Sequence, residues 1–104
     1  MRAERTRPSA KQTPSDLPSV LAIVVTHNGQ QWLRDCLVAL ANQSYGLLDV
    51  LVVDDASAGH RTERPSIRRI AKRHLRRKRW GYLRTPRPLG FGGAINWALG
   101  RVRT

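Results

Sequence analysis

Two adjacent carboxylates, Asp54 and Asp55, follow the apolar residues 50–53 and are the side chains of this sequence best placed to do chemistry. A carboxylate at the end of a buried strand can accept hydrogen bonds from a sugar hydroxyl or from a base N–H. It can also cap a loop or a helix, because aspartate readily accepts from nearby backbone N–H groups. Neighbouring residues of a strand point to opposite faces, so both carboxylates can face one site only where the chain bends. We disfavour a carboxylate pair for glycoside hydrolysis.

A second polar group, Thr26-His27-Asn28, follows the first long apolar run. The His27 imidazole could stack on a base or form a hydrogen bond, and a structural histidine held by its neighbours is the alternative. Neither His60 nor His74 has a histidine or cysteine partner at a metal-binding spacing. The sequence therefore predicts no metal ligands in this chain, and it predicts a core or boundary position for His74.

The glycine-rich segment Gly90-Phe91-Gly92-Gly93 precedes a predicted helix. Glycines let a ligand approach the backbone closely, and a helix N-terminus attracts an anion. A plain junction between a loop and a helix is the alternative. The segment lacks the Gly-x-Gly-x-x-Gly spacing, and no Lys followed by Ser or Thr comes after it, so it is neither a dinucleotide fingerprint nor a P-loop.

These polar groups need a scaffold that brings strand ends together. Short runs rich in β-branched residues are typical of strands buried on both faces of a parallel sheet, and apolar residues at helical spacing predict amphipathic helices. The predicted elements are strands at 20–25 and 50–53, a weaker strand at 80–83, and helices over about 30–43, from just after Pro65, and from near Phe91 or Gly92. The order β-α-β-α-β-α predicts a Rossmann-like α/β fold with a three-stranded, mainly parallel sheet. Such sheets bind ligands beyond the carboxyl ends of their strands, where both polar groups lie.

Composition bounds the class of protein. Hydrophobic residues make up 40% of the 104 residues, which excludes a wholly disordered chain and fits one small domain. The single cysteine, Cys36, excludes an intramolecular disulfide, and its place on the apolar face of the first helix predicts an inert core thiol. No stretch approaches the ~18 apolar residues of a membrane span, and the N-terminus lacks the apolar core of a signal peptide. We therefore expect a cytoplasmic protein with a flexible basic leader, 1–18, and a folded part, 19–104.

The positive charge is concentrated in one block. The chain carries 19 Lys and Arg against 7 Asp and Glu, a net charge of +12, and residues 61–87 hold twelve of the basic residues against Glu63 alone. Such a block suggests a nucleic acid, an anionic membrane surface or a phosphate-bearing ligand, and the adjacent Trp80 could stack on a base. We favour a solvated helix face over a nucleic-acid site, because the apolar stripe of that helix already explains its part in the fold.

Four segments, in the right order, resemble family 2 glycosyltransferases. Residues 20–28 resemble the opening strand of that family, which ends in Thr, an aromatic residue or His, and Asn. Residues 32–45 resemble the helix that follows, and residues 52–57, Val-Val-Asp-Asp-Ala-Ser, match the family's Val-Asp-Asp-x-Ser block. Residues 89–99 resemble its later glycine-rich segment with a helical Asn. The resemblance spans about residues 19–100.

The resemblance implies the nucleotide-sugar-binding half of a GT-A domain, from an enzyme that transfers a sugar from a nucleoside-diphosphate sugar to an acceptor. By this analogy His27 would contact the base, Asp55 would accept a hydrogen bond from the base or the ribose, and Thr26 would help to shape the pocket. Residues 90–96 would line the donor side. The nucleotide-binding residues expected from the resemblance are Thr26, His27, Asn28, Asp54, Asp55, Gly90, Gly92, Gly93 and Asn96. It implies no catalytic residue in this chain.

Two departures from the family pattern limit the expected activity. Pro88 stands where the family commonly has an Asn, and the chain ends at Thr104, before the Asp-x-Asp metal motif and the catalytic base. The Mg²⁺ or Mn²⁺ expected for the full-length family enzyme is therefore not expected to be a cofactor of this chain. We expect a truncated half-domain that is inactive alone, has its first strand as an exposed apolar edge, and needs the missing C-terminal half or a partner chain. An anionic membrane surface at the inner face, or a lipid-linked acceptor, is compatible with this function.

Overall fold

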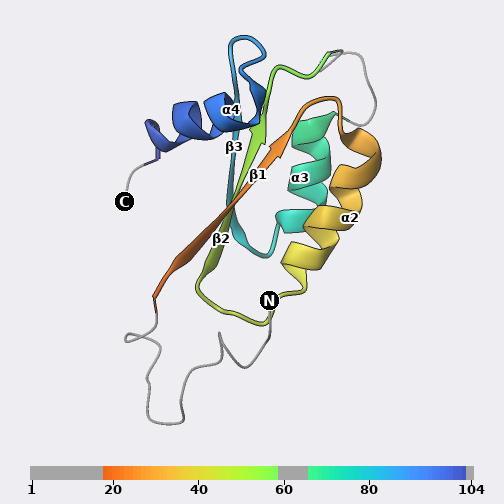
Figure 1. Ribbon diagram of the computed structural model, residues 1–104. Coiled ribbons are helices and arrows are strands. Elements are labelled where there is room, and N and C mark those ends of the chain that lie inside the picture. Colours follow the sequence, from red (N-terminus) through yellow and green to blue (C-terminus); the bar gives the residue numbers. More distant parts are fainter. Residues whose placement is uncertain (1–17, 59–65, 103–104) are drawn as a thin grey trace.

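A computed structural model describes residues 18–58 and 66–102 of the chain (Figure 1). The predicted order of elements is confirmed. In chain order they are β1 (Val20–Thr26), α2 (Gln30–Ala41), β2 (Leu48–Asp54), α3 (Ile67–Leu75), β3 (Arg79–Arg84) and α4 (Gly90–Leu99). The predicted leader lies outside the described residues except for Pro18, and so does His60.

The three strands form one parallel sheet in the order β1-β2-β3, as predicted for a Rossmann-like α/β fold. β2 is the central strand, and its residues alternate between two apolar layers because successive side chains of a strand point to opposite faces. Val50 and Val52 belong to one buried cluster, while Leu51 and Val53 belong to the other. A strand that contributes to two cores has no polar face, which explains its continuous apolar run.

The two faces of the sheet are covered unequally (Figure 1). Helices α2 and α3 lie on one face and bury the larger cluster, which includes Leu33, Leu37 and Ile70. Among the described elements, helix α4 covers the other face, through the fully buried small side chains Ala94 and Ala98. Small side chains let the α4 backbone approach the sheet closely, and this matters for the site because α4 begins beside the end of β2.

β1 packs on both faces of the sheet, as predicted, with Ala22 and Val24 against one cluster and Ile23 and Val25 against the other. These four side chains are only partly buried, and Val20 and Leu21 are 43% and 40% exposed, because β1 is an outer strand of the sheet among the described residues. The expectation of an exposed apolar edge at this strand is confirmed.

Cys36 is half-buried and lies at the margin of the core, because the buried stripe of α2 is centred on Leu33 and Leu37. Burial raises the pKa of the Cys36 thiol, so it stays protonated at neutral pH and is a poor nucleophile.

The helix bounds differ slightly from those predicted. α2 ends at Ala41, two residues early, and α4 begins at Gly90, so the glycine-rich segment is the first turn of the helix and not a loop before it. α3 begins after Ser66, whose hydroxyl accepts a hydrogen bond from the Arg69 amide and caps the helix. His74 is half-buried, at the boundary position predicted for it.

Candidate functional site

The polar groups singled out in the sequence meet at the carboxyl edge of the sheet. The parallel register pairs Thr26 at the end of β1 with Asp54 at the end of β2, and pairs Asp54 with Arg84 at the end of β3. The ladder continues one residue further, because the Asp55 amide donates to the Thr26 carbonyl at 2.8 Å. The strand ends therefore bring the β1–α2 loop and the β2–α3 loop side by side.

Asp54 is completely buried and accepts three hydrogen bonds from its own chain. The Ser57 amide donates to its Oδ1 at 2.9 Å, while the Tyr82 hydroxyl and Arg84 Nη1 donate to its Oδ2 at 2.8 and 3.0 Å. Burial by itself raises the pKa of this carboxyl, but the hydrogen bonds from Ser57 and Tyr82 and the charge of Arg84 together hold it below its ordinary value. Asp54 is thus a buried anion that ties the end of β2 to β3.

Asp55 is 3% exposed and holds the beginning of α4. Its Oδ1 accepts from the Thr85 hydroxyl at 2.9 Å and from the Leu89 amide at 2.8 Å, and its Oδ2 accepts from the Gly90 amide at 2.9 Å. Burial raises the pKa of Asp55, but the bonds from Leu89, Thr85 and Gly90 outweigh it, and the pKa lies below its ordinary value. Because Leu89 offers no capping side chain, Asp55 supplies the anion that a helix N-terminus favours.

The two carboxylates point to opposite faces of the sheet, as strand alternation requires. Asp54 bonds to Tyr82, which packs on the α2–α3 side, and Asp55 bonds to the N-terminus of α4 on the other side. All four carboxylate oxygens accept at least one hydrogen bond within the chain. Both aspartates therefore cap nearby backbone N–H groups, which was the structural alternative considered from the sequence. Each carboxylate accepts three bonds and keeps about one unused lone-pair position.

His27 and Asn28 are exposed beside this buried pair. His27 Nδ1 lies 2.6 Å from the Asp55 carbonyl oxygen, and the side-chain nitrogen Nδ2 of Asn28 lies 3.1 Å from His27 Nε2. These two partners assign the tautomer, because the carbonyl needs a donor at Nδ1 and the amide N–H needs an acceptor at Nε2. The imidazole is therefore held in one orientation with its ring exposed to solvent.

Asn28 fastens the β1–α2 loop to the β2–α3 loop. Its φ of 56° lies in the left-handed region, which asparagine adopts more readily than most residues. Its backbone amide donates to the Ser57 hydroxyl at 2.8 Å, and its side-chain Oδ1 accepts from the Ala58 backbone amide at 2.7 Å. Asn28 thus has a structural role in addition to the ligand contact expected from the sequence.

Thr26 has the least satisfied polar group of the site. The residue is 1% exposed, and its hydroxyl has no hydrogen-bond partner among the described residues. A Cβ added to Gly29 would collide with this hydroxyl, so the glycine backbone packs closely against it. A buried hydroxyl without a partner costs roughly 1–3 kcal/mol.

Replacing Gly29 with alanine is expected to lower the free energy of unfolding by roughly 1–3 kcal/mol. A Cβ at this position would collide with Thr26 Oγ1 and with the Trp32 indole nitrogen, and the buried threonine has little room to move. Urea denaturation followed by circular dichroism measures the change. Gly46→Ala is the matched control, because a Cβ there meets nothing within 4 Å, and a loss at Gly29 no larger than at Gly46 would contradict the prediction.

The structure does not bring every predicted residue to this edge. Gly90 joins the site through its backbone amide and has a φ of 78°, which suits glycine. Gly92, Gly93 and Asn96 are exposed on α4, on the side of the helix away from the buried Ala94 and Ala98. Their predicted role on the donor side stays a prediction.

Sequence reasoning missed four residues that support the site. Tyr82 and Arg84 donate hydrogen bonds to Asp54, and Thr85 donates to Asp55. The fourth is Ser57, whose hydroxyl accepts from the Asn28 backbone amide. A signal for the first three was present, because their polar side chains cluster at the carboxyl end of the weak third strand. The carboxyl ends of parallel strands meet at one edge, so residues at the end of β3 belong with those at the ends of β1 and β2.

A comparison with protein families agrees with these motifs. A family model described as glycosyl transferase family 2 matches residues 21–104, which is most of the chain. The chain belongs to glycosyltransferase family 2. No curated protein matches it. Membership of this family of glycosyltransferases assigns a general role in glycosyl transfer and supports the identification of the sheet as part of a GT-A domain.

The divalent metal ion of full-length family 2 glycosyltransferases does not fit the residues described here. Asp54 and Asp55 face opposite sides of the sheet, and their oxygens already accept hydrogen bonds from the chain. Within residues 18–58 and 66–102, no three His, Cys, Asp or Glu side chains come together in a group that could hold a metal ion.

The glycosyltransferase chain is expected to lose stability in acid. Asp54 and Asp55 have pKa values below their ordinary value of 3.8 in the folded state, so the unfolded chain binds more protons as the pH falls. The contribution of these two carboxylates to the free energy of unfolding is complete above about pH 5. It is lost as the pH falls below about 4 and through their pKa values in the folded state. Urea midpoints measured at stepped pH test this. The Asp54→Asn variant should show a shallower acid slope, and a midpoint unchanged from neutral pH to about pH 3 would contradict the prediction.

In the described parts of the chain, no helix combines the length and the hydropathy that crossing a membrane requires.

Proposed function

We propose that this chain forms the donor-nucleotide-binding half of a family 2 glycosyltransferase and binds the nucleoside diphosphate of a sugar donor at the carboxyl edge of its sheet. The observation that carries the proposal is the oriented, solvent-exposed His27 ring at the carboxyl edge of the sheet. An exposed aromatic ring held at both nitrogens offers a flat surface to a base.

The remaining contacts are limited by the bonds already present. Asp55 can accept from a base or ribose through its unused lone-pair position, since three of about four are occupied. The amides of Leu89 and Gly90 are taken by Asp55, so a phosphate at the N-terminus of α4 would use the amides of the next two helical residues. The diphosphate would then lie between the β1–α2 loop and the first turn of α4.

We propose further that the chain by itself does not turn over a sugar donor. Transfer needs a base that removes the proton of the acceptor hydroxyl. Both carboxylates at the strand ends are buried and serve as hydrogen-bond acceptors within the chain. Incubation with a panel of nucleotide sugars and acceptors, in the presence of Mg²⁺ or Mn²⁺, should release no nucleoside diphosphate. Metal-dependent release would overturn this part of the proposal.

Isothermal titration calorimetry with UDP and with GDP tests the binding proposal. We expect saturable binding of at least one of them, weakened about tenfold by His27→Ala, because stacking on one aromatic ring contributes about 1–3 kcal/mol. Asn42→Ala is the control, since Asn42 is exposed at the C-terminal end of α2, away from the strand ends. Absence of binding by the folded protein, or equal affinity of the wild type and His27→Ala, would refute the proposal.

A further inference from the structure

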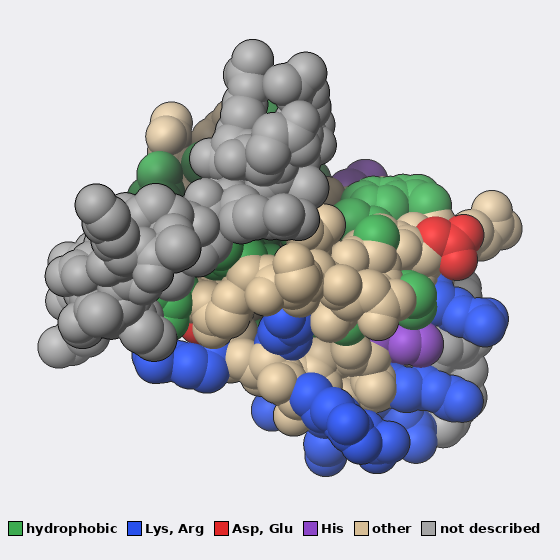
Figure 2. Space-filling model, turned by 90° about the horizontal axis from the view of Figure 1, so that it is seen from below, with side chains coloured by type: hydrophobic (Ala, Val, Ile, Leu, Met, Phe, Trp, Pro, Cys, Tyr) green, Lys and Arg blue, Asp and Glu red, His purple; other side chains and the backbone are tan. Residues whose placement is uncertain are grey.

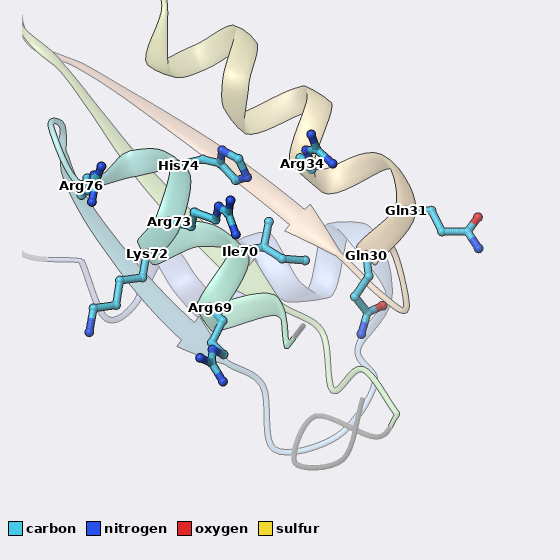
Figure 3. Close-up of a pocket in the computed structure, with 9 residues that line it drawn as sticks. All are labelled: Gln30, Gln31, Arg34, Arg69, Ile70, Lys72, Arg73, His74 and Arg76. Carbon is cyan, nitrogen blue, oxygen red and sulfur yellow. The ribbon is translucent and has the colours of Figure 1, made fainter. Parts of the chain in front are cut away.

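A groove lined by basic side chains runs between α2 and α3, outside the site at the strand ends. Its volume is about 1030 Å³, and Figure 3 shows that the side chains around it come from these two helices and from Arg76, which directly follows α3. The lining residues are Gln30, Gln31, Arg34, Arg69, Ile70, Lys72, Arg73, His74 and Arg76. Five of the nine carry a permanent positive charge, and no acidic side chain of the described residues lines the groove.

The fold itself produces this concentration of charge. The apolar residues of α3, Ile67, Ile70, Ala71 and Leu75, are buried against α2 and the sheet. All the other side chains of α3 are Arg, Lys or His, so its outward face is basic along the whole length of the helix. Figure 2 shows Lys and Arg side chains gathered around one region of the surface, with a histidine among them. Like charges held this close repel one another, and an anionic partner removes that cost.

We infer that the α2–α3 groove and the basic face of α3 bind the phosphate headgroups of an anionic lipid bilayer. Guanidinium groups suit this ligand because their fork of donors matches phosphate oxygens, and four of the five cations of the groove are arginines. Each basic residue close to an anionic leaflet strengthens attachment, so a row of them on one helix face acts together. The apolar side chains of α3 are buried in the core, so the contact is electrostatic and does not require insertion.

Two observations favour a bilayer over a nucleic acid. No Phe, Tyr or Trp side chain is among the nine lining residues, and the imidazole of His74 is half-buried, whereas single-stranded nucleic acids are held by stacking on exposed aromatic rings as well as by charge. Trp80, the residue that the sequence suggested for stacking, lies on β3, is half-buried and packs against the core. The groove therefore offers many contacts to phosphates and no exposed ring on which a base could stack.

The position of the groove relates this surface to the proposed site. Gln30, at one end of the groove, begins α2 only three residues after His27. A bilayer bound along α2 and α3 would therefore lie close to the carboxyl edge of the sheet. The inference does not depend on nucleotide binding, and the two proposals can fail separately because one is tested with vesicles and the other with nucleoside diphosphates.

Sedimentation with lipid vesicles tests the inference on the full chain. We expect binding to vesicles of equal parts phosphatidylcholine and phosphatidylserine, no binding to pure phosphatidylcholine, and release by added salt. The double variant Arg69→Gln with Arg73→Gln should bind about 25-fold more weakly, on the basis of about fivefold for each charge removed. Circular dichroism confirms that each variant is folded, since glutamine is as good a helix former as arginine.

The control removes the same charge elsewhere. Arg87→Gln with Arg101→Gln leaves the groove intact, because Arg87 lies in the β3–α4 loop and Arg101 stacks over Trp97 beyond α4. An equal loss in this control, equal binding to neutral vesicles, or no binding to either kind of vesicle would overturn the inference. So would a single-stranded or duplex RNA that displaces the protein from the anionic vesicles at a lower concentration of phosphate, because a nucleic acid would then be the better partner.

Discussion

Replacing Asp54 with alanine is expected to lower the free energy of unfolding by about 3–5 kcal/mol, the usual cost of removing one partner of a buried ion pair. The Arg84 guanidinium and the Tyr82 hydroxyl would lose their acceptor, and the Ser57 amide would lose its bond in the loop. Asp54 is fully buried, and the side chain of Arg84 is only 28% exposed, so water replaces little of what is lost. For a small domain this is a large part of the total stability.

Urea denaturation of Asp54→Ala, Asp54→Asn and Asp49→Asn separates this buried pair from a surface pair. Asp49 forms an ion pair with Arg79 at 3.6 Å, but the Arg79 side chain is 89% exposed, so its loss should cost less than about 1 kcal/mol. If Asp54→Ala does not fold, Asp54→Asn keeps an acceptor for the Ser57 amide and provides the measurement. Equal losses at Asp54 and Asp49 would contradict the prediction.

Tyr82 provides an independent measure of the same interaction. Burial, the hydrogen bond to Asp54 and the negative charge of Asp54 raise the pKa of Tyr82 to about 12. Asp54→Asn removes the charge, so the tyrosine absorbance should titrate at a lower pH in this variant than in the wild type. An unchanged titration would show that Asp54 does not face the Tyr82 hydroxyl.

Replacing Asp55 with alanine is expected to lower the free energy of unfolding by about 2–4 kcal/mol and to loosen α4 from the sheet. The Leu89 and Gly90 amides and the Thr85 hydroxyl would all lose their acceptor, and each buried donor without a partner costs roughly 1–3 kcal/mol. The helix would also lose the anion at its N-terminus. The effect should concentrate in α4, since only Ala94 and Ala98 are fully buried from that helix.

Amide hydrogen exchange of the Asp55→Ala variant measures this local effect. Protection should fall in α4 more than in α2, whose Leu33 and Leu37 are buried in the other cluster. Asp35→Ala is the control, because Asp35 is exposed on α2. A uniform fall in protection over the whole sheet would contradict a specific role at the N-terminus of α4.

The same variant bears on nucleotide binding. Because Asp55 holds α4, a loss of UDP or GDP affinity in Asp55→Ala has two possible causes, and the stability measurement separates them. If the variant keeps the stability of the wild type and binds no nucleotide, the main role of Asp55 is contact with the ligand. His27→Ala is the cleaner test of the ligand contact, because it removes an exposed ring and one bond to the Asp55 carbonyl, whereas Asp55→Ala removes the acceptor of three bonds.

Much of the fold could be predicted because its signals are local. The continuous apolar run of β2 and the helical spacing of Ile67, Ile70 and Ala71 each reflect which side chains must leave water within a few residues. The family resemblance rests on the same kind of local pattern, and the match over residues 21–104 confirms it. The position of Thr26, His27 and the two aspartates at one edge followed from parallel strand order alone.

The roles of the site residues depend on contacts between distant parts of the chain, which no local pattern encodes. Asp55 bonds to amides 34 and 35 residues later, and Asp54 bonds to side chains 28 and 30 residues later. The sequence by itself determined the order of the elements, the parallel sheet and the edge at which polar groups gather, because hydrophobic periodicity acts over short distances. Only the tertiary structure decided that both carboxylates turn inward to opposite faces, because that choice depends on which donors β3 and α4 bring to them.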